Sequence, residues 1–550
     1  MNADIPSTAD AQERTLTKPT THLTRRSVVA ALSTLPAAGL AGRASPAAAQ
    51  AAPRKGGTMI MVMQSEPPAL LSFVNSSSIA LTGRTTEGLL QYDDNLKPLP
   101  SLATAWEVSP DGLTYTFQLR QGVKWHDGKD FTAEDVIFSI QTVKRLHPRG
   151  RSTFQFVSSI EAPTPHTVVL KLSKPTPFLL TALAAMETAI VPKHVYGDAD
   201  PLSHPNNTAP IGTGPYVFKE WVRGSHAIWE RNPDYWDKDG AYLDRLIVRF
   251  ILDPAARTIA FETSSVHVGY RTPVPHRDVE RLKALPHIRF EPKGYAYDPP
   301  NIIIAEFNLD NPYLKNLKVR QAIAHCVDRA ALCRIVFFGN ALPSASPVVP
   351  YHKDFHDARP SPYPFNVNAA QKLLDEAGYP RRGNAMRFTI NIDYTGEDQR
   401  PVAEFLRSSL ARAGIGLDLR SQDMGTLVRR VYTDRDFGVH LASISNLFDP
   451  NVGVQRLYWS KNYLRGVPFS NGTHYSNAEV DALLEQASIE PDKDKRITAW
   501  MRVQEIVKTE LPNLPLAMAT WQTIHHVAAQ GHTVNAEGFE GTFSKAFMAE

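Results

Sequence analysis

The fold is decided by residues 102–139, LATAWEVSPDGLTYTFQLRQGVKWHDGKDFTAEDVIFS. Apolar and polar side chains alternate at 106–108 and at 113–119, which is typical of strands. The Pro-Asp-Gly sequence at 110–112 favours a tight turn between them. At 132–135, Thr-Ala-Glu-Asp is a capping-box pattern, in which a hydroxyl and an acid three residues later bind free backbone N–H groups at a helix start. The stretch therefore predicts a strand meander that continues into an amphipathic helix, and its role is structural.

The same stretch resembles the signature of family 5 of the bacterial extracellular solute-binding proteins, which serve peptide, opine and nickel ABC importers. Further segments resemble that family in the expected order: GTGPY at 212–216, NPDYW at 232–236, VRQAI at 319–323 and KLLDEAGY at 372–379. The resemblance covers almost all of the chain after residue 55. It implies an α/β, two-lobe periplasmic binding protein fold of type II, with an extra accessory subdomain and a hinge made of two crossings.

The resemblance also gives expected lobe boundaries. Lobe I would comprise residues 52–300 and 525–550, including an accessory subdomain at about 85–200, and lobe II would comprise residues 301–524. Helical and strand patterns alternate throughout the second of these regions, as in an α/β domain. The two crossings, and hence the hinge, are expected at about 295–301 and 520–526.

Within the second region, individual patterns predict particular elements. They indicate a long helix over 316–337, a strand over 387–393, a helix over 402–413 and a strand over 437–445. Near the beginning of the proposed mature chain, GTMIMVM at 57–63 is an apolar run of strand length.

Composition describes an ordinary soluble globular protein. The 550 residues are 43% apolar and 21% charged, and the formal net charge is only +3. Because basic and acidic residues are nearly equal in number, the sequence predicts no basic stripe on the surface. We therefore expect no nucleic-acid partner. The partners that the resemblance implies are a small-molecule solute and the transmembrane permease subunits of an ABC importer, with the protein itself a monomer.

Cysteine and histidine spacing predicts no metal site and no cofactor. Cys326 and Cys333 lie in one helical pattern, where a rise of about 1.5 Å per residue puts their Cα atoms roughly 10 Å apart, too far for a disulfide. We expect two buried thiols. His525 and His526 are neighbours in a predicted strand, so their side chains point to opposite faces and cannot share one metal.

The sequence also lacks the motifs of common hydrolases. It contains neither a His-Glu-x-x-His helix nor a Gly-x-Ser-x-Gly elbow, and we expect no enzyme activity. A secreted hydrolase is the remote alternative. The nearer alternative is a nickel-chelate or haem carrier of the same fold, because relatives bind metal through a small chelator without a cluster of protein ligands.

Residues 1–51 are expected to be an export signal. Arg25-Arg26 precedes an apolar run that ends near Gly42, and small residues follow at Ala47–Ala51. This order predicts a twin-arginine signal peptide and a periplasmic protein. The apolar run of about 16 residues is short for a membrane span, and no cysteine lies near the cleavage site, so neither stable membrane insertion nor a lipid anchor is expected.

By resemblance, eight residues are expected to line the ligand cleft: Asn446, Ser443, Ser445, Met424, Gly396, Tyr297, Trp459 and Asn75. Alignment on Asp449-Pro450 puts Ser443 where dipeptide-binding members carry a tryptophan. It also puts Asn446 where they carry the aspartate that pairs with the peptide α-ammonium, and Gly396 where they offer an arginine to the carboxylate.

These differences from the dipeptide-binding members affect which ligand we expect. An amide supplies no net charge, and charge-assisted hydrogen bonds are about twice as strong as neutral ones. We therefore expect a ligand bulkier or less charged than a dipeptide, such as an opine, a modified peptide or a sugar-containing conjugate. Arg400, Arg420 and Arg456 are candidate carboxylate partners, although ordinary structural charges are commoner, and Tyr295 and Tyr458 are candidate stacking surfaces.

Overall fold

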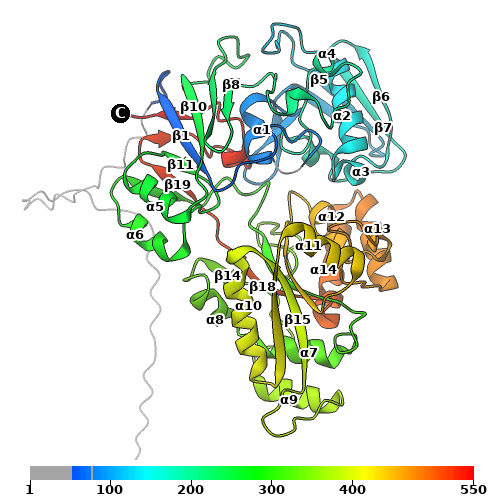
Figure 1. Cartoon of the computed structure of the whole chain (residues 1–550). Helices are drawn as coiled ribbons and strands as arrows, with labels where there is room; N and C mark the ends of the chain where they lie inside the picture. The colour runs from blue at the N-terminus through cyan, green and yellow to red at the C-terminus, as the bar shows by residue number, and fades with distance from the viewer. Residues whose placement is uncertain (1–51, 76–77) are drawn as a thin grey trace, which may run out of the picture. The chain divides into compact units, whose positions relative to one another are not determined.

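A computed structural model describes residues 52–75 and 78–550, and Ala52–Glu550 form one compact unit (Figure 1). The predicted signal peptide lies outside the described residues. Two large β-sheets and one smaller, four-stranded sheet organise the unit, and two further sheets have two strands each. No helix among the described residues is long and apolar enough to cross a membrane.

The first large sheet has seven strands and is built around the predicted strand near the start of the described chain. Its strand order is β12-β19-β11-β1-β10-β9-β8. The bounds are β1 (Thr58–Met63), β8 (Tyr216–Val222), β9 (His226–Arg231), β10 (Arg245–Phe250), β11 (Val268–Gly269), β12 (Ile288–Glu291) and β19 (Thr523–His526). Central β1 is parallel to both of its neighbours, β10 and β11. Its buried Met59 and Met61 explain why this strand is apolar almost throughout. Helices α5 (Pro254–Glu262) and α6 (Val279–Lys283) pack beside it.

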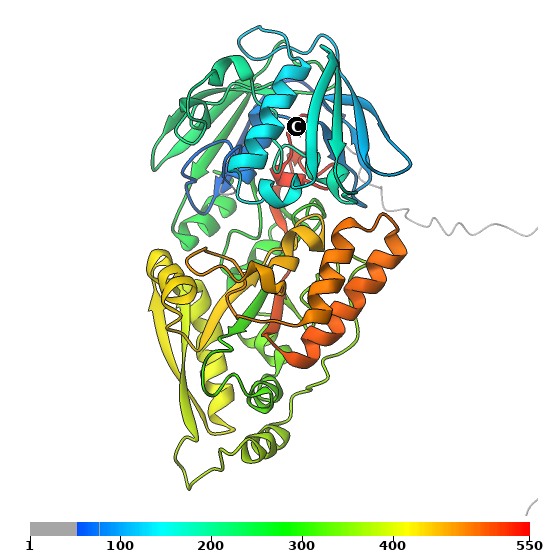
Figure 2. The same ribbon diagram turned by 90° about the vertical axis from the view of Figure 1, so that its right-hand side faces the viewer.

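The second large sheet has six strands, in the order β14-β18-β13-β17-β15-β16. The bounds are β13 (Ile302–Phe307), β14 (Ala341–Pro343), β15 (Phe388–Thr395), β16 (Ile415–Gln422), β17 (Val439–Ile444) and β18 (Asn513–Ala519). Helices α7 (Leu317–Cys326), α9 (Val367–Glu376) and α10 (Gly396–Ala411) contribute to one core cluster with it. Helices α13 (Ala478–Ile489) and α14 (Lys493–Glu510) contribute to another and lie side by side, as Figure 2 shows. The predicted alternation of helices and strands is confirmed.

The predicted long helix over 316–337 is wrong. The chain forms two helices there, α7 and α8 (Arg329–Ile335), separated by Val327 in an extended conformation. The Asp328 side chain accepts a hydrogen bond from the backbone N–H of Ala331 at 2.9 Å and thereby starts the second helix. An aspartate that caps a new helix competes with continuation of the previous one. Cys326 and Cys333 therefore lie in different helices, and both are free and buried, as predicted.

The opening stretch folds as predicted, within the smaller sheet. Strands β4 (Ala103–Val108), β5 (Thr114–Leu119), β7 (Thr167–Leu172) and β6 (Val157–Thr164) form it in that order, and β4 begins earlier than the alternation indicated. Helix α2 (Ala133–Leu146) packs against β6 and β7 and is part of the same core cluster.

Three polar groups meet at the start of α2, on the carboxylate of Asp135. It accepts hydrogen bonds from the backbone N–H of Thr132 and of Lys193, both at 2.9 Å, and from the indole N–H of Trp125 at 3.4 Å. One buried carboxylate thus joins the helix start to the turn before it and to the segment around residue 193.

We predict that Asp135→Ala lowers the free energy of unfolding by about 1–3 kcal/mol, because it leaves buried donors without acceptors. The matched control is Asp130→Ala, which removes only an exposed ion pair with Lys124 and is expected to lower it by at most about 1 kcal/mol. Denaturant unfolding of both variants measures the difference. Equal losses would contradict the role of Asp135.

Candidate functional site

The two large sheets are joined by two segments, one between β12 and β13 and one between β18 and β19. A buried ion network lies at these segments, and we call it the crossing network: Arg271, Asp298 and Glu540. The Arg271 guanidinium bridges both carboxylates, and its Nη2 lies 2.7 Å from Oε1 of Glu540. Both carboxylates are buried, and burial raises the pKa of Glu540 while the positive charge of Arg271 opposes that rise.

Aromatic rings hold the bridging arginine in place. The Arg271 guanidinium carbon lies 4.4 Å from the ring centre of Trp521 and 5.1 Å from that of Tyr270. The backbone N–H of Arg271 donates to the hydroxyl of Tyr295 at 2.9 Å. Trp521 lies in the return segment from the second large sheet, so the network touches both connections between the sheets.

Residues that follow strand β17 reach the crossing network. The Ser445 hydroxyl donates to Oδ1 of Asp298 at 3.5 Å, and the ring of Phe448 lies 5.0 Å from that of Tyr297. Tyr297 also contacts Tyr92 at 5.2 Å between ring centres and donates its hydroxyl to the backbone oxygen of Thr181 at 2.6 Å. The second-sheet region is thus packed against the accessory region through aromatic contacts.

Two further arginines, Arg149 and Arg456, interact electrostatically with each other. Arg149 makes a bidentate ion pair with the buried Glu187, with its Nε 2.9 and 3.1 Å from the carboxylate oxygens. Arg456 donates from Nη1 to the backbone oxygen of Phe469 at 2.6 Å, and no ion pair of Arg456 with a carboxylate occurs among the described residues. Burial lowers the pKa of Arg456, Tyr432 and the negative charge of Glu306 partly oppose this, and the positive charge of Arg149 lowers it further.

Asn446, which the sequence predicts to contact ligand, is bound to backbone groups of the protein. Its side chain is 0% exposed. Its amide donates to the backbone oxygen of Pro347 at 3.1 Å and accepts from the backbone N–H of Val349 at 2.9 Å. The amide therefore fixes the 347–349 segment, and an aspartate at this position would set a carboxylate oxygen against the Pro347 oxygen. A direct contact with ligand stays a prediction.

The other predicted cleft residues are spread over several elements. Ser445 contacts Asp298, the residue after Tyr297 in the chain, whereas Ser443 is exposed on β17. Met424 is 54% exposed where α11 (Met424–Val428) begins, and Gly396, with a φ of +66°, begins α10.

The remaining two residues have structural partners. The Trp459 indole donates to Glu485 at 2.9 Å, and the Asn75 amide donates to the backbone oxygen of Leu71 at 3.0 Å. Their predicted ligand contacts stay predictions.

The candidate arginines and tyrosines separate into two kinds. Arg420 pairs with the buried Asp393 at 2.6 Å, and Tyr458 donates to Asn513 at 3.0 Å, so both already have partners inside the protein. Tyr295 likewise lies within hydrogen-bond distance of Thr523, at 2.9 Å. Arg456 has no such carboxylate partner among the described residues, which makes it the better candidate for an anionic group of a ligand.

Sequence reasoning missed the crossing network. Arg271 and Asp298 are 27 residues apart, and Arg271 and Glu540 are 269 apart, so no local pattern joins them. Among the described residues, no group of three or more His, Cys, Asp or Glu side chains could hold a metal ion.

Glu537 lies beside this network as a buried acid with an unpaired oxygen. Its Oε1 has no hydrogen-bond partner among the described residues. Burial and the nearby charge of Glu540 raise its pKa to about 8, from an ordinary value of 4.5. Because the folded-state value is the higher one, protonated Glu537 favours the folded state. This contribution is complete below about pH 4.5 and is lost as the pH rises towards 8.

We predict that Glu537→Gln gains stability relative to the wild type as the pH is raised from about 5 to 8, because the glutamine stays neutral. Denaturant midpoints at several pH values measure this, with Glu107→Gln, a change at an exposed position, as the control. A difference between Glu537→Gln and wild type that does not change with pH would contradict the shifted pKa.

Comparison with known proteins agrees with this architecture. Residues 97–466 match the model of the bacterial extracellular solute-binding proteins, family 5. An ABC transporter peptide-binding protein of Brucella ovis is 30% identical over 474 residues, which cover 80% of this chain and 83% of the relative. Heme-binding protein A of Haemophilus influenzae is 28% identical over 446 residues, which cover 76% and 78%.

A solved structure is similar along nearly the whole described chain. The ABC transporter-associated periplasmic binding protein DppA of Helicobacter pylori, in complex with the peptide STSA, has a TM-score of 0.77 and 25% sequence identity. The match covers 90% of this chain and 99% of that one. The expected α/β fold of the two-lobe periplasmic binding proteins is confirmed. All three similar proteins are named for binding. The chain belongs to the bacterial extracellular solute-binding proteins of family 5.

Proposed function

We propose that this protein is the periplasmic receptor of an ABC importer, which captures a peptide-like, opine-like or related organic solute and delivers it to the membrane permease. Lobe I comprises residues 52–300 and 525–550, and lobe II comprises residues 301–524. The observation that carries the proposal is the meeting of Ser445 and Phe448 with Asp298 and Tyr297 beside the two connections between the large sheets.

These contacts suit a hinge. A small set of backbone positions at the two connections can absorb a rotation of one lobe against the other. A solute that contacts both lobes binds better to the closed form, and this difference in affinity drives closure. The permease then distinguishes the closed, loaded receptor from the open one. The protein acts as a monomer and performs no chemistry on the solute.

The charges favour a solute with at least one carboxylate. Arg149 of lobe I already forms an ion pair with Glu187, whereas Arg456 of lobe II forms no ion pair with a carboxylate among the described residues. A ligand anion near Arg456 would offset its interaction with the positive charge of Arg149. Peptides and opines both carry such a group.

The second candidate is a haem or nickel-chelate carrier of the same fold. The likeness to heme-binding protein A of Haemophilus influenzae favours it. Native mass spectrometry of the protein purified from the periplasm distinguishes the candidates, because a co-purified organic solute, a porphyrin and a metal chelate differ in mass and isotope pattern. A protein that never carries a solute and changes a substrate into a product would overturn the proposal.

We predict that Arg456→Met weakens binding of the co-purified solute by about 10- to 100-fold, which is the loss of one charge-assisted hydrogen bond. Isothermal titration calorimetry measures the affinity. The matched control is Arg465→Met, which replaces an exposed arginine that donates to the backbone oxygen of Thr433 and should leave the affinity unchanged. Equal affinities of Arg456→Met and wild type would remove Arg456 from the site.

Residues 1–51 are proposed to direct export through the twin-arginine route. Replacing Arg25 and Arg26 with lysine is expected to keep the protein in the cytoplasm, because that route reads the arginine pair. Fractionation of cells with an antibody to the mature chain measures this. Undiminished periplasmic protein in the double variant would contradict the proposed route but leave the proposed receptor function intact.

A further inference from the structure

A small cavity lies inside the second-sheet region, where the start of α8, the end of α14 and the start of β18 come together. Its volume is about 10 Å³, which is room for one water-sized occupant. The polar residues at its wall are Arg329, Ser361, Tyr458, Lys508 and Asn513. No aspartate or glutamate is among the residues that line it.

Arg329 is a partly buried cation without a carboxylate partner among the described residues. Its Nε donates to the backbone oxygen of Pro515 at 2.7 Å, and no ion pair of Arg329 with a carboxylate occurs among the described residues. Burial alone lowers its pKa to about 10, and no nearby acid opposes this effect. The guanidinium therefore stays charged at neutral pH. A buried charge is costly unless something of opposite sign lies beside it.

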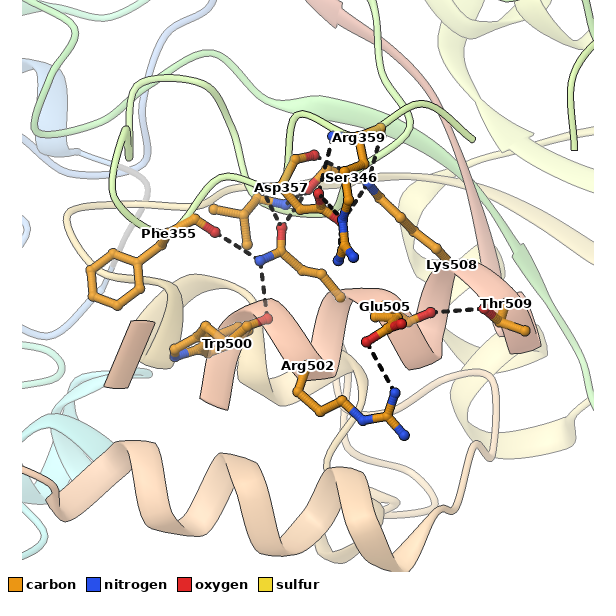
Figure 3. Close-up of polar contacts among 11 residues, drawn as sticks. Ser346, Phe355, Asp357, Arg359, Trp500, Arg502, Glu505, Lys508 and Thr509 are labelled. Atoms are coloured by element: carbon orange, nitrogen blue, oxygen red, sulfur yellow. Dashed lines mark hydrogen bonds and ion pairs between the residues drawn. The ribbon is translucent and has the colours of Figure 1, made fainter. Parts of the chain in front are cut away.

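Figure 3 draws two acids near this cavity, and both are already paired: Glu505 accepts from Arg502 at 3.0 Å, and Asp357 has two cationic partners. Asp357 accepts from the Lys508 ammonium at 2.8 Å and from Nε of Arg359 at 2.8 Å. Burial opposes ionisation of Asp357, but the hydrogen bonds from Arg359 and Lys508 outweigh it and lower the pKa to about 2. Because two cations already pair with this carboxylate, Asp357 does not serve as the counter-ion of Arg329.

Asn513 supplies an independent sign of an occupant. It is 2% exposed, and its Oδ1 accepts from the Tyr458 hydroxyl at 3.0 Å. Its Nδ2, in contrast, has no hydrogen-bond partner among the described residues. A buried amide N–H₂ group without an acceptor costs about 1–3 kcal/mol, so the cavity at its side is expected to hold an acceptor.

We propose that this cavity binds a small inorganic anion, chloride in particular. A chloride accepts a hydrogen bond from the Asn513 amide while it neutralises Arg329, and the Ser361 hydroxyl keeps its bond to the backbone oxygen of Tyr363. A water molecule would fill the space but would leave the guanidinium charge uncompensated. The site is independent of the proposed solute site, although it borders Pro347, whose backbone oxygen holds the Asn446 amide.

The first test is the melting temperature of the wild-type protein in sodium chloride and in sodium gluconate at equal ionic strength, so that screening is the same. An anion that binds only the folded state raises the melting temperature. We expect chloride and bromide to raise it by about 2–5 °C over gluconate. Equal melting temperatures in the three salts would overturn the proposal.

Variants locate the effect. Arg329→Met is expected to lose the difference between chloride and gluconate. Arg334→Met is the matched control, since Arg334 lies on the same helix, is exposed and does not line the cavity, and it should keep the full difference. A chloride effect that survives unchanged in Arg329→Met would overturn the assignment to this cavity.

A second measurement uses the wild-type protein and needs no variant. Crystals of the wild-type protein grown with sodium bromide are expected to show an anomalous scattering peak in the cavity, in contact with the Arg329 guanidinium. A water molecule there, with no anomalous signal, would overturn the proposal. Neither outcome affects the solute-binding function, which uses other residues.

Discussion

A buried ion network lies at the connections between the two large sheets, where Arg271 bridges Asp298 and Glu540. The carboxylates come from the two ends of the first-sheet region, and Asp298 lies in the connection to the second sheet. Removing the arginine would leave two buried carboxylates unpaired, and such a loss is typically worth about 3–5 kcal/mol. Ser445 contacts Asp298 from the second-sheet region, so any movement at the connections changes the surroundings of this network.

Much of the fold could be predicted from local pattern, because hairpins and helix starts are determined by residues close in sequence. The turn at 110–112 and the helix start at Thr132 illustrate this. The helix predicted over 316–337 failed for a related reason: apolar spacing continued through Asp328, but its side chain starts a new helix. The crossing network could not be predicted, since its members are brought together only by the folded chain.

The candidate site depends on side-chain partners that the sequence does not give, and its ligand contacts stay predictions. Resemblance indicated Asn446 as a ligand contact, yet the structure gives its amide two backbone partners and no exposure. A family alignment identifies a position but not its side-chain partners, which depend on the 347–349 segment. Arg456, by contrast, was one of three equal candidates from the sequence. The structure separates it from Arg420, because Arg420 is paired with Asp393.

Family membership describes a two-lobe receptor for a solute, and we propose that its lobes close over the solute and that Arg456 lies beside it. Small-angle X-ray scattering of the mature protein, with its co-purified solute removed and then restored, tests this most directly. The account predicts a smaller radius of gyration when the solute is present, as the lobes rotate together. Superimposable scattering curves at saturating solute would contradict it.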